Sequence, residues 1–284
     1  MKDQIMRTSI KSLMARTRAF CLVTLALVCL VLVFSSQAQI ITLQDGNSIA
    51  KIDPYGQVGM FDWTVGGIDQ LKRQWFWYRV GSSGPESSID TISAPTVTQS
   101  VPYQATTLYG NPAFSVEVTY LLTGGAASST LSETIAIVNH TATNLDFHFF
   151  QYSDVDLGGI PGDQSVVLNA TLARARQTSL SSGFAVETAL QNANHREAAL
   201  VGQTLAGLND AFATTLNDNL MAGPGDVTFA FQWDYTIAAG DSRIISKIKT
   251  VPEPSAIALM ALGLLAFTLR RAGAKAESAP ANRR

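Results

Sequence analysis

The stretch FAFQWDYTI, residues 229–237, alternates large apolar side chains with small or polar ones for nine residues. A second stretch, FSVEVTYLL at 114–122, repeats this alternation. Strict alternation is typical of a strand in an antiparallel sheet, with one face in the core and the other toward solvent. These two stretches predict an all-β body.

Further segments have the composition of strands and are separated by Gly- and Pro-rich turns, which favours an antiparallel β-sandwich. These segments are 57–65, 74–80, 131–138, 145–153, 165–172, 183–188 and 243–249. One helix is expected in the body, within 194–220, where Gly202 and Gly207 make it short or broken.

The charges are unevenly distributed along the chain. Residues 39–250 contain 10 basic and 19 acidic side chains, a net charge of −9, whereas the whole chain has a net charge of −2. Binding to a phosphate backbone needs a basic surface. The body is therefore not expected to bind nucleic acid.

Residues 1–38 have the pattern of a secretory signal peptide. Basic residues precede an uninterrupted apolar run at 20–34, and small residues occupy the positions before a cut ahead of Gln39. The alternative is an uncleaved anchor, although a membrane span needs about 20 apolar residues. Met14 is an alternative start that would give a signal of more ordinary length.

The C-terminal region has three parts in order: the tripeptide Pro252-Glu253-Pro254, an apolar stretch at 256–269 and the basic pair Arg270-Arg271. The prolines hold the tripeptide extended, and a hydrophobic helix is expected after it. The basic pair would remain on the cytoplasmic side of a membrane. An ordinary C-terminal anchor that follows a chance Pro-Glu-Pro is the alternative.

This order resembles the PEP-CTERM sorting signal of Gram-negative bacteria. The resemblance implies export, a transient inner-membrane anchor, and processing by an exosortase that recognises Pro252, Glu253 and Pro254. It also implies an association with exopolysaccharide and biofilm. The expected organisation is a signal peptide at 1–38, a β-sandwich domain at 39–250 and a sorting signal at 251–284.

Parts of the body resemble a group of uncharacterised PEP-CTERM proteins. The segments that carry this resemblance are QWFWYR at 74–79, LDFHFFQYSD at 145–154 and GDVTFAFQW at 225–233. This resemblance implies no activity.

The stretch LDFHFFQYSDVDL at 145–157 is the main candidate for chemistry. On a strand it places three carboxylates, one imidazole and two aromatic rings on one face. The catalytic candidates on this face are Asp146, His148 and Asp154, with His148 or Asp146 as the base. Two alternatives are a sugar-binding platform and a buried layer in which Asp146 and His148 bond to each other.

Aromatic side chains are the candidates for sugar binding. Trp75 and Trp77 share one face of the predicted strand at 74–80, and Tyr152 lies on the polar face of 145–157. Rings of this kind stack on sugars, but a strand such as 74–80 is more often buried on both faces.

Asp154, Asp156 and Asp163 are weak candidates for a metal site. Ca²⁺ prefers several oxygen ligands on a loop that bends around the ion, and glycines separate these aspartates. The loop is not an EF-hand, because position 12 counted from Asp154 is Ser165. Turns rich in Asp and Gly also occur without a metal.

Together these features predict an exported protein of the cell surface or extracellular matrix. Its body is interpreted as a non-catalytic structural or adhesive component of an exopolysaccharide layer. The alternative is a carbohydrate-binding module or an enzyme that modifies the polysaccharide.

Overall fold

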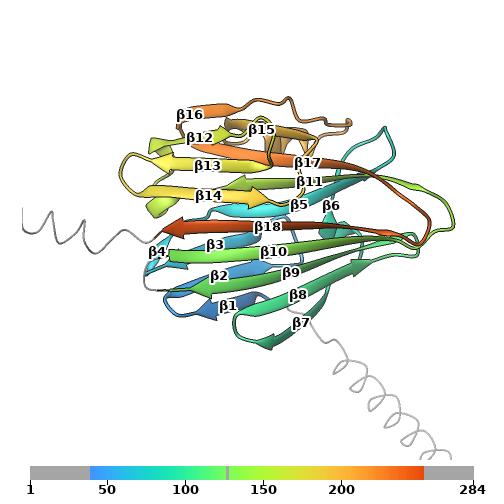
Figure 1. Ribbon diagram of the computed structural model, residues 1–284, viewed down its shortest axis with the longest axis horizontal. Coiled ribbons are helices and arrows are strands. Elements are labelled where there is room, and N and C mark those ends of the chain that lie inside the picture. Colours follow the sequence, from blue (N-terminus) through green and yellow to red (C-terminus); the bar gives the residue numbers. More distant parts are fainter. Residues whose placement is uncertain (1–38, 126–127, 253–284) are drawn as a thin grey trace, which may run out of the picture. The chain divides into compact units, whose positions relative to one another are not determined.

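The computed structural model describes residues 39–125 and 128–252. The predicted signal peptide and the sorting signal from Glu253 onward lie outside the described residues. Two large sheets make up the described part, and their strands pair antiparallel except where β3 and β5 meet. Figure 1 shows the two sheets as layers of a sandwich. The expected all-β sandwich is therefore confirmed.

The first sheet runs in the order β1-β2-β3-β5-β11-β17-β15, with β4 and β6 at its margins. Its strands are β1 (Ile41–Asp45), β2 (Ser48–Asp53), β3 (Gly59–Val65), β4 (Ile68–Asp69), β5 (Arg73–Val80), β6 (Ser87–Ser88), β11 (Leu145–Asp154), β15 (His195–Leu200) and β17 (Val227–Ile237).

The second sheet runs in the order β16-β12-β13-β14-β18-β10-β9-β8-β7. Its strands are β7 (Thr96–Val101), β8 (Gln104–Gly110), β9 (Phe114–Gly124), β10 (Ser128–Asn139), β12 (Gln164–Leu168), β13 (Arg174–Ser179), β14 (Gly183–Ala189), β16 (Met221–Gly225) and β18 (Ser242–Pro252).

Both faces of the first sheet are buried at its centre. On the inner face, Phe76 of β5 stacks on Phe149 of β11, and the Gln74 side chain donates to Glu133 of the opposite sheet. On the outer face, the Trp77 indole N–H donates to Asn209 in the segment that follows β15. Because both faces are covered, the strand at 74–80 is a core strand. This agrees with the interpretation that the strand is buried on both faces, and not with a sugar-stacking surface.

The segment 194–220 holds one short helix, α2 (Gln203–Gly207), which follows Gly202 directly. The residues before it, HREAAL, form β15 instead of helix, although Arg, Glu, Ala and Leu all favour helix. Pairing with β17 along its whole length overrides this local preference.

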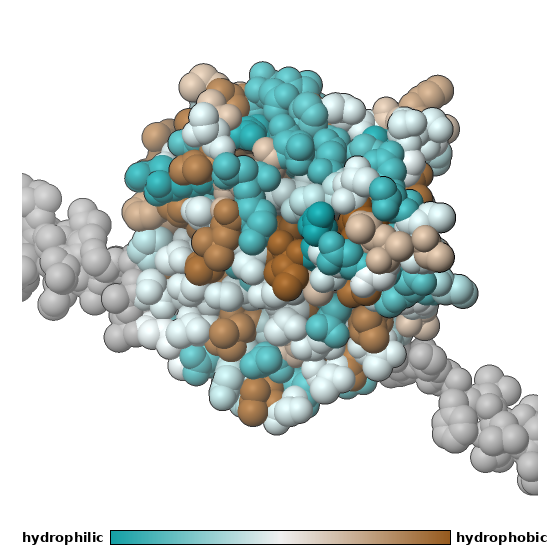
Figure 2. All heavy atoms as spheres, turned by 45° about the vertical axis from the view of Figure 1, so that its right-hand side comes forward, coloured by the Kyte–Doolittle hydropathy of each residue, from teal (hydrophilic) through white to brown (hydrophobic). Residues whose placement is uncertain are grey.

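Hydrophobic side chains on the exposed face in Figure 2 are separated from one another by polar ones. In the second sheet, Ile244 and Ile248 of β18 are about half exposed. Within the described ranges, no helix is long and apolar enough to span a membrane.

Candidate functional site

Three carboxylates and two imidazoles alternate in a row on the outer face of the first sheet. His148 of β11 and Asp234 of β17 are directly paired in register, and Nδ1 of His148 lies 2.6 Å from Oδ1 of Asp234. The other oxygen of Asp234 lies 3.8 Å from Nε2 of His195 in β15. Asp146 and Asp218 end the row, 3.7 Å from Nε2 of His148 and 2.9 Å from Nδ1 of His195. We call these five residues the His–Asp row.

The backbone and neighbouring side chains hold the His–Asp row in place. The Gln232 side chain donates to Asp234 at 2.8 Å, and the backbone N–H of Asp234 donates to Asn194. Asp218 accepts from the backbone N–H of Arg196. Burial alone would raise the pKa of Asp218, but the hydrogen bonds from His195 and Arg196 outweigh it and lower that pKa.

Its hydrogen bonds define the chemistry of the row. A carboxylate only accepts, so His148 donates from Nδ1 to Asp234, and the neutral ring then has its lone pair on Nε2. Among the described residues, Nε2 of His148 is buried and has no hydrogen-bond partner, and its nearest acidic neighbour is Asp146. Imidazole is suited to accept or donate a proton near neutral pH. His195 is the more exposed of the two imidazoles, with 33% of its side chain accessible against 14% for His148.

The candidate catalytic residues divide between two places on β11. Asp146 and His148 belong to the His–Asp row, where they lie 3.7 Å apart. Asp154 lies six residues further along the strand, roughly 20 Å away at about 3.3 Å per residue. It therefore belongs to a different cluster from the other two.

The three aromatic residues named as sugar-binding candidates are buried. Trp75, Trp77 and Tyr152 each have 0% exposed surface. Trp77 packs edge-on against Tyr152, and the Trp75 indole N–H donates to Ser88 at 2.7 Å. Rings covered in this way present no face on which a sugar can stack.

Asp154, Asp156 and Asp226 form an acidic triad at the end of β11. Asp226 comes from the turn between β16 and β17, and one carboxylate oxygen from each residue lies within 4.8 Å of the others. Asp163, the third residue expected from the sequence, is elsewhere. Its carboxylate accepts from the hydroxyl and backbone N–H of Ser181. The expected set is thus corrected: Asp226 replaces Asp163.

Burial and mutual repulsion raise the pKa values of the acidic triad. Burial, followed by the charges of Asp156 and Asp226, raises the pKa of Asp154 to about 7. Burial and then Asp226 raise the pKa of Asp156 to about 6. Lys72 and Arg73 act in the opposite direction on Asp154, but neither forms an ion pair with a triad member within the described part of the chain.

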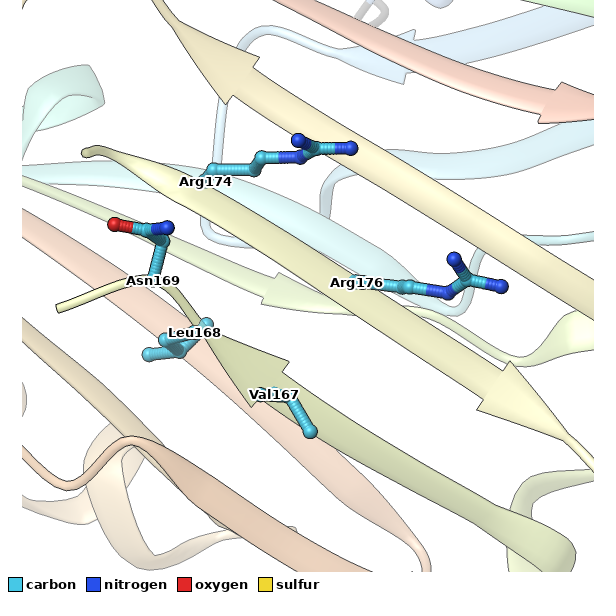
Figure 3. A pocket seen from close by; sticks show the side chains of 5 residues that line it. All are labelled: Val167, Leu168, Asn169, Arg174 and Arg176. Carbon is cyan, nitrogen blue, oxygen red and sulfur yellow. The ribbon is translucent and has the colours of Figure 1, made fainter.

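A shallow hollow of about 240 Å³ lies over β12 and β13 on the second sheet (Figure 3). Arg174 and Arg176 extend from β13 beside it, and the Arg176 guanidinium lies 4.6 Å from the centre of the Phe184 ring. No carboxylate or imidazole is among the residues that line this hollow. It lacks the acid–base groups of the His–Asp row.

Sequence reasoning missed Asp234, His195 and Asp218 as functional candidates. The alternation at 229–237 already placed Asp234 on the polar face of a strand. His195 stood in a segment expected to be helical, so its pairing next to β17 was not foreseen.

Comparison with protein families finds the PEP-CTERM protein-sorting motif at residues 250–272. The chain carries a PEP-CTERM sorting motif. This motif confirms the resemblance drawn from Pro252, Glu253 and Pro254, and it implies an exported protein that an exosortase processes at the cell envelope. Arg270 and Arg271 fall inside the matched range. No curated protein matches the sequence, so the resemblance of the body to an uncharacterised group gains no support.

Several solved structures share the fold at low sequence identity. A candidate aldose 1-epimerase from Escherichia coli K12 is 12% identical, with 76% of this chain and 99% of that chain covered and a TM-score of 0.53. A galactose mutarotase related enzyme from Lactobacillus acidophilus is 8% identical, with 76% and 98% covered and a TM-score of 0.52. A bacterial glucoamylase in complex with acarbose is 7% identical, with 82% of this chain but only 36% of that chain covered and a TM-score of 0.51.

These similarities establish a shared fold. They also overturn the prediction that the body of this PEP-CTERM protein is a non-catalytic structural or adhesive component. That prediction relied on the association of the sorting signal with exopolysaccharide. The fold is instead the one found in proteins described as sugar epimerases and in part of a glucoamylase.

Proposed function

We propose that the domain at 39–250 is an exported carbohydrate-active domain that binds a sugar at the His–Asp row and transfers protons to and from it. The observation that carries this proposal is the close pairing of His148 with Asp234, extended by His195 on the other side of the same carboxylate. The names of the structural neighbours support a sugar as the ligand.

The chemistry of the row suits a sugar. Carboxylate and imidazole groups accept hydrogen bonds from hydroxyls. Nε2 of His148 has no partner among the described residues and is buried, so the side chains around it would have to shift for a sugar hydroxyl to reach it. Asp234 stabilises the imidazolium that forms, since it already accepts the Nδ1 hydrogen bond. Interconversion at the anomeric carbon of a reducing sugar needs one group that removes a proton and one that supplies it. His148 and His195, on either side of Asp234, are the two groups proposed for these roles.

The PEP-CTERM motif supports a site of action outside the cytoplasm for this proposed activity. We propose removal of residues 1–38 as a signal peptide, a transient inner-membrane anchor within 251–284, and release to the surface or matrix of a Gram-negative bacterium. The polysaccharide of that layer or its sugar units would then be the substrates that the domain meets.

Polarimetry of the purified full chain with freshly dissolved α-D-galactose or α-D-glucose tests the activity. We expect optical rotation to reach equilibrium faster than without protein. His148→Ala should slow the catalysed rate by roughly 100-fold or more, the usual contribution of a general acid or base. His140→Ala is the matched control, because His140 is an exposed histidine bonded to Ser115 and is not part of the row.

A second assay follows the size of the producing cell's exopolysaccharide by size-exclusion chromatography. Shortened polymer that depends on His148 would assign the same row to hydrolysis. If wild-type protein neither binds nor converts sugars or polymer, or if His148→Ala is as active as His140→Ala, the proposed function is wrong.

A further inference from the structure

The acidic triad is not used by the proposed sugar chemistry, and its composition differs from that of the His–Asp row. It contains three carboxylates, Asp154, Asp156 and Asp226, and no imidazole. None of the three side chains makes a hydrogen bond or an ion pair with the residues of 39–125 and 128–252. Three neighbouring carboxylates without a partner are unfavourable unless a cation or protons neutralise them.

Asp154 is the strongest indication of a ligand. Only 7% of Asp154 is exposed, yet its Oδ1 atom has no hydrogen-bond partner among the described residues. Buried polar atoms in proteins almost always have a partner, which includes bound ions.

We propose that Asp154, Asp156 and Asp226 bind one Ca²⁺ ion. Ca²⁺ takes oxygen ligands at about 2.4 Å, so two ligands of one ion are at most about 4.8 Å apart. The observed carboxylate oxygens all lie within 4.8 Å of one another. The set contains no nitrogen or sulfur ligand, which distinguishes it from the sites that Zn²⁺ prefers.

The positions of the ligands indicate what the ion does. Asp154 and Asp156 lie at the end of β11 in the first sheet, and Asp226 lies in the turn that leads from β16 of the second sheet into β17. An ion held by all three therefore joins the end of β11 to this turn. Calcium stabilises the folded domain by RT ln(1 + [L]/Kd), because the unfolded chain does not keep the three carboxylates together.

Isothermal titration of CaCl₂ into the EDTA-treated and dialysed full chain tests the site. We expect one Ca²⁺ per chain, and a rise of the thermal unfolding midpoint that NaCl of equal ionic strength does not produce. Asp226→Asn should weaken Ca²⁺ binding at least tenfold. Asp163→Asn is the matched control, because Asp163 is a carboxylate of another turn, lies outside the triad and accepts hydrogen bonds from Ser179 and Ser181 at Oδ2, and it should change the affinity less than twofold.

Terbium luminescence gives an independent measurement on the unmodified chain. Tyr152 lies two residues from Asp154, so light absorbed by the protein should sensitise bound Tb³⁺, and Ca²⁺ should displace it. Far-UV circular dichroism establishes that the variants are folded, and Asp156→Asn replaces Asp226→Asn if the latter does not fold. The proposal is overturned if wild-type protein binds no Ca²⁺, or if Asp226→Asn and Asp156→Asn bind it as tightly as Asp163→Asn.

Discussion

Ser153 and Asp154 are neighbours on β11, yet they face two charged regions of opposite character. Ser153 faces the interior, where its hydroxyl lies 3.5 Å from Glu187. There Glu133, Glu187, Lys247 and Lys249 form a network of two acids and two bases, each 1–2% exposed. We call this first region the interior network. Asp154 points to the other face, where it belongs to the acidic triad, which contains three acids and no base.

The interior network and the acidic triad differ in how their charges are compensated. In the interior network, Glu133 is directly opposite Lys247 in the sheet, and Glu187 is directly opposite Lys249. Burial alone would raise the pKa of Glu187, but the two lysines outweigh it and lower that pKa. In the acidic triad, burial and like charges both raise the pKa values. Pairing within the sheet therefore neutralises one region, while the other needs an external cation or protons.

The largest effect is expected from breaking the interior network. Lys247→Met removes the base that contacts both Glu133 and Glu187 and leaves a buried negative charge uncompensated. We expect the free energy of unfolding to fall by about 3–5 kcal/mol, measured by urea denaturation. Ile248→Met, at the half-exposed next position, is the control and should change it by less than about 0.5 kcal/mol. Equal stability of the two variants would show that the network is not balanced as described.

The dependence of stability on pH, measured in EDTA so that no Ca²⁺ is bound, should distinguish the acidic triad from the interior network. The raised pKa values of Asp154 and Asp156 mean that the folded state binds more protons, so stability should fall as pH rises from about 4 to about 7. The loss is on the order of 4 kcal/mol for Asp154 alone, at about 1.4 kcal/mol per pKa unit. Burial is its main cause, followed by the charges of Asp156 and Asp226, while Arg73 and Lys72 oppose it.

The lowered pKa of Glu187 acts in the opposite direction. Its stabilisation is present above the unfolded pKa of 4.5 and is lost as pH falls through the lower folded value. Thermal unfolding in EDTA should therefore show a maximum of stability at about pH 4 to 5. A midpoint that rises steadily from pH 5 to pH 8 would contradict the description of the acidic triad.

A smaller effect is expected from Asp154→Asn in EDTA at pH 8. Removal of one charge relieves the repulsion with Asp156 and Asp226, and the midpoint should rise, by about 1 kcal/mol in free energy of unfolding. The same substitution at pH 5, where Asp154 is protonated, should have less effect. A loss of stability at both pH values would show that the carboxylate has a partner.

The smallest effect is expected from Asp163→Asn, measured by urea denaturation. This carboxylate is compensated by uncharged donors, the hydroxyls of Ser179 and Ser181 and a backbone N–H. Its pKa is lowered by the hydrogen bond from Ser181, then by the one from Ser179. Because an amide oxygen still accepts from these donors, we expect the urea midpoint to stay nearly unchanged. A clear fall of the midpoint would mean that the turn depends on the charge.

The sequence by itself determined the strands and the sorting signal. Alternation along 114–122 and 229–237 is a local pattern. The first stretch lies in β9 and the second in β17. The order of Pro252, Glu253 and Pro254 before an apolar stretch and a basic pair is likewise local, and the family comparison confirms it. Hairpins with weaker alternation, such as β1 and β2, were not predicted, since pairing and burial define them more than their own residues do.

Only the tertiary structure decided which polar side chains meet. His148 and Asp234 are 86 residues apart in the chain, and the pairing of β11 with β17 brings them to 2.6 Å. Asp226 joins Asp154 for the same reason, because Thr228 is directly opposite Asp154 in that register. Local alternation specifies the face on which a side chain lies, but the strand that pairs next to it depends on the burial of the whole core. That choice placed a proton-transfer row and an acidic triad at two separate points of β11.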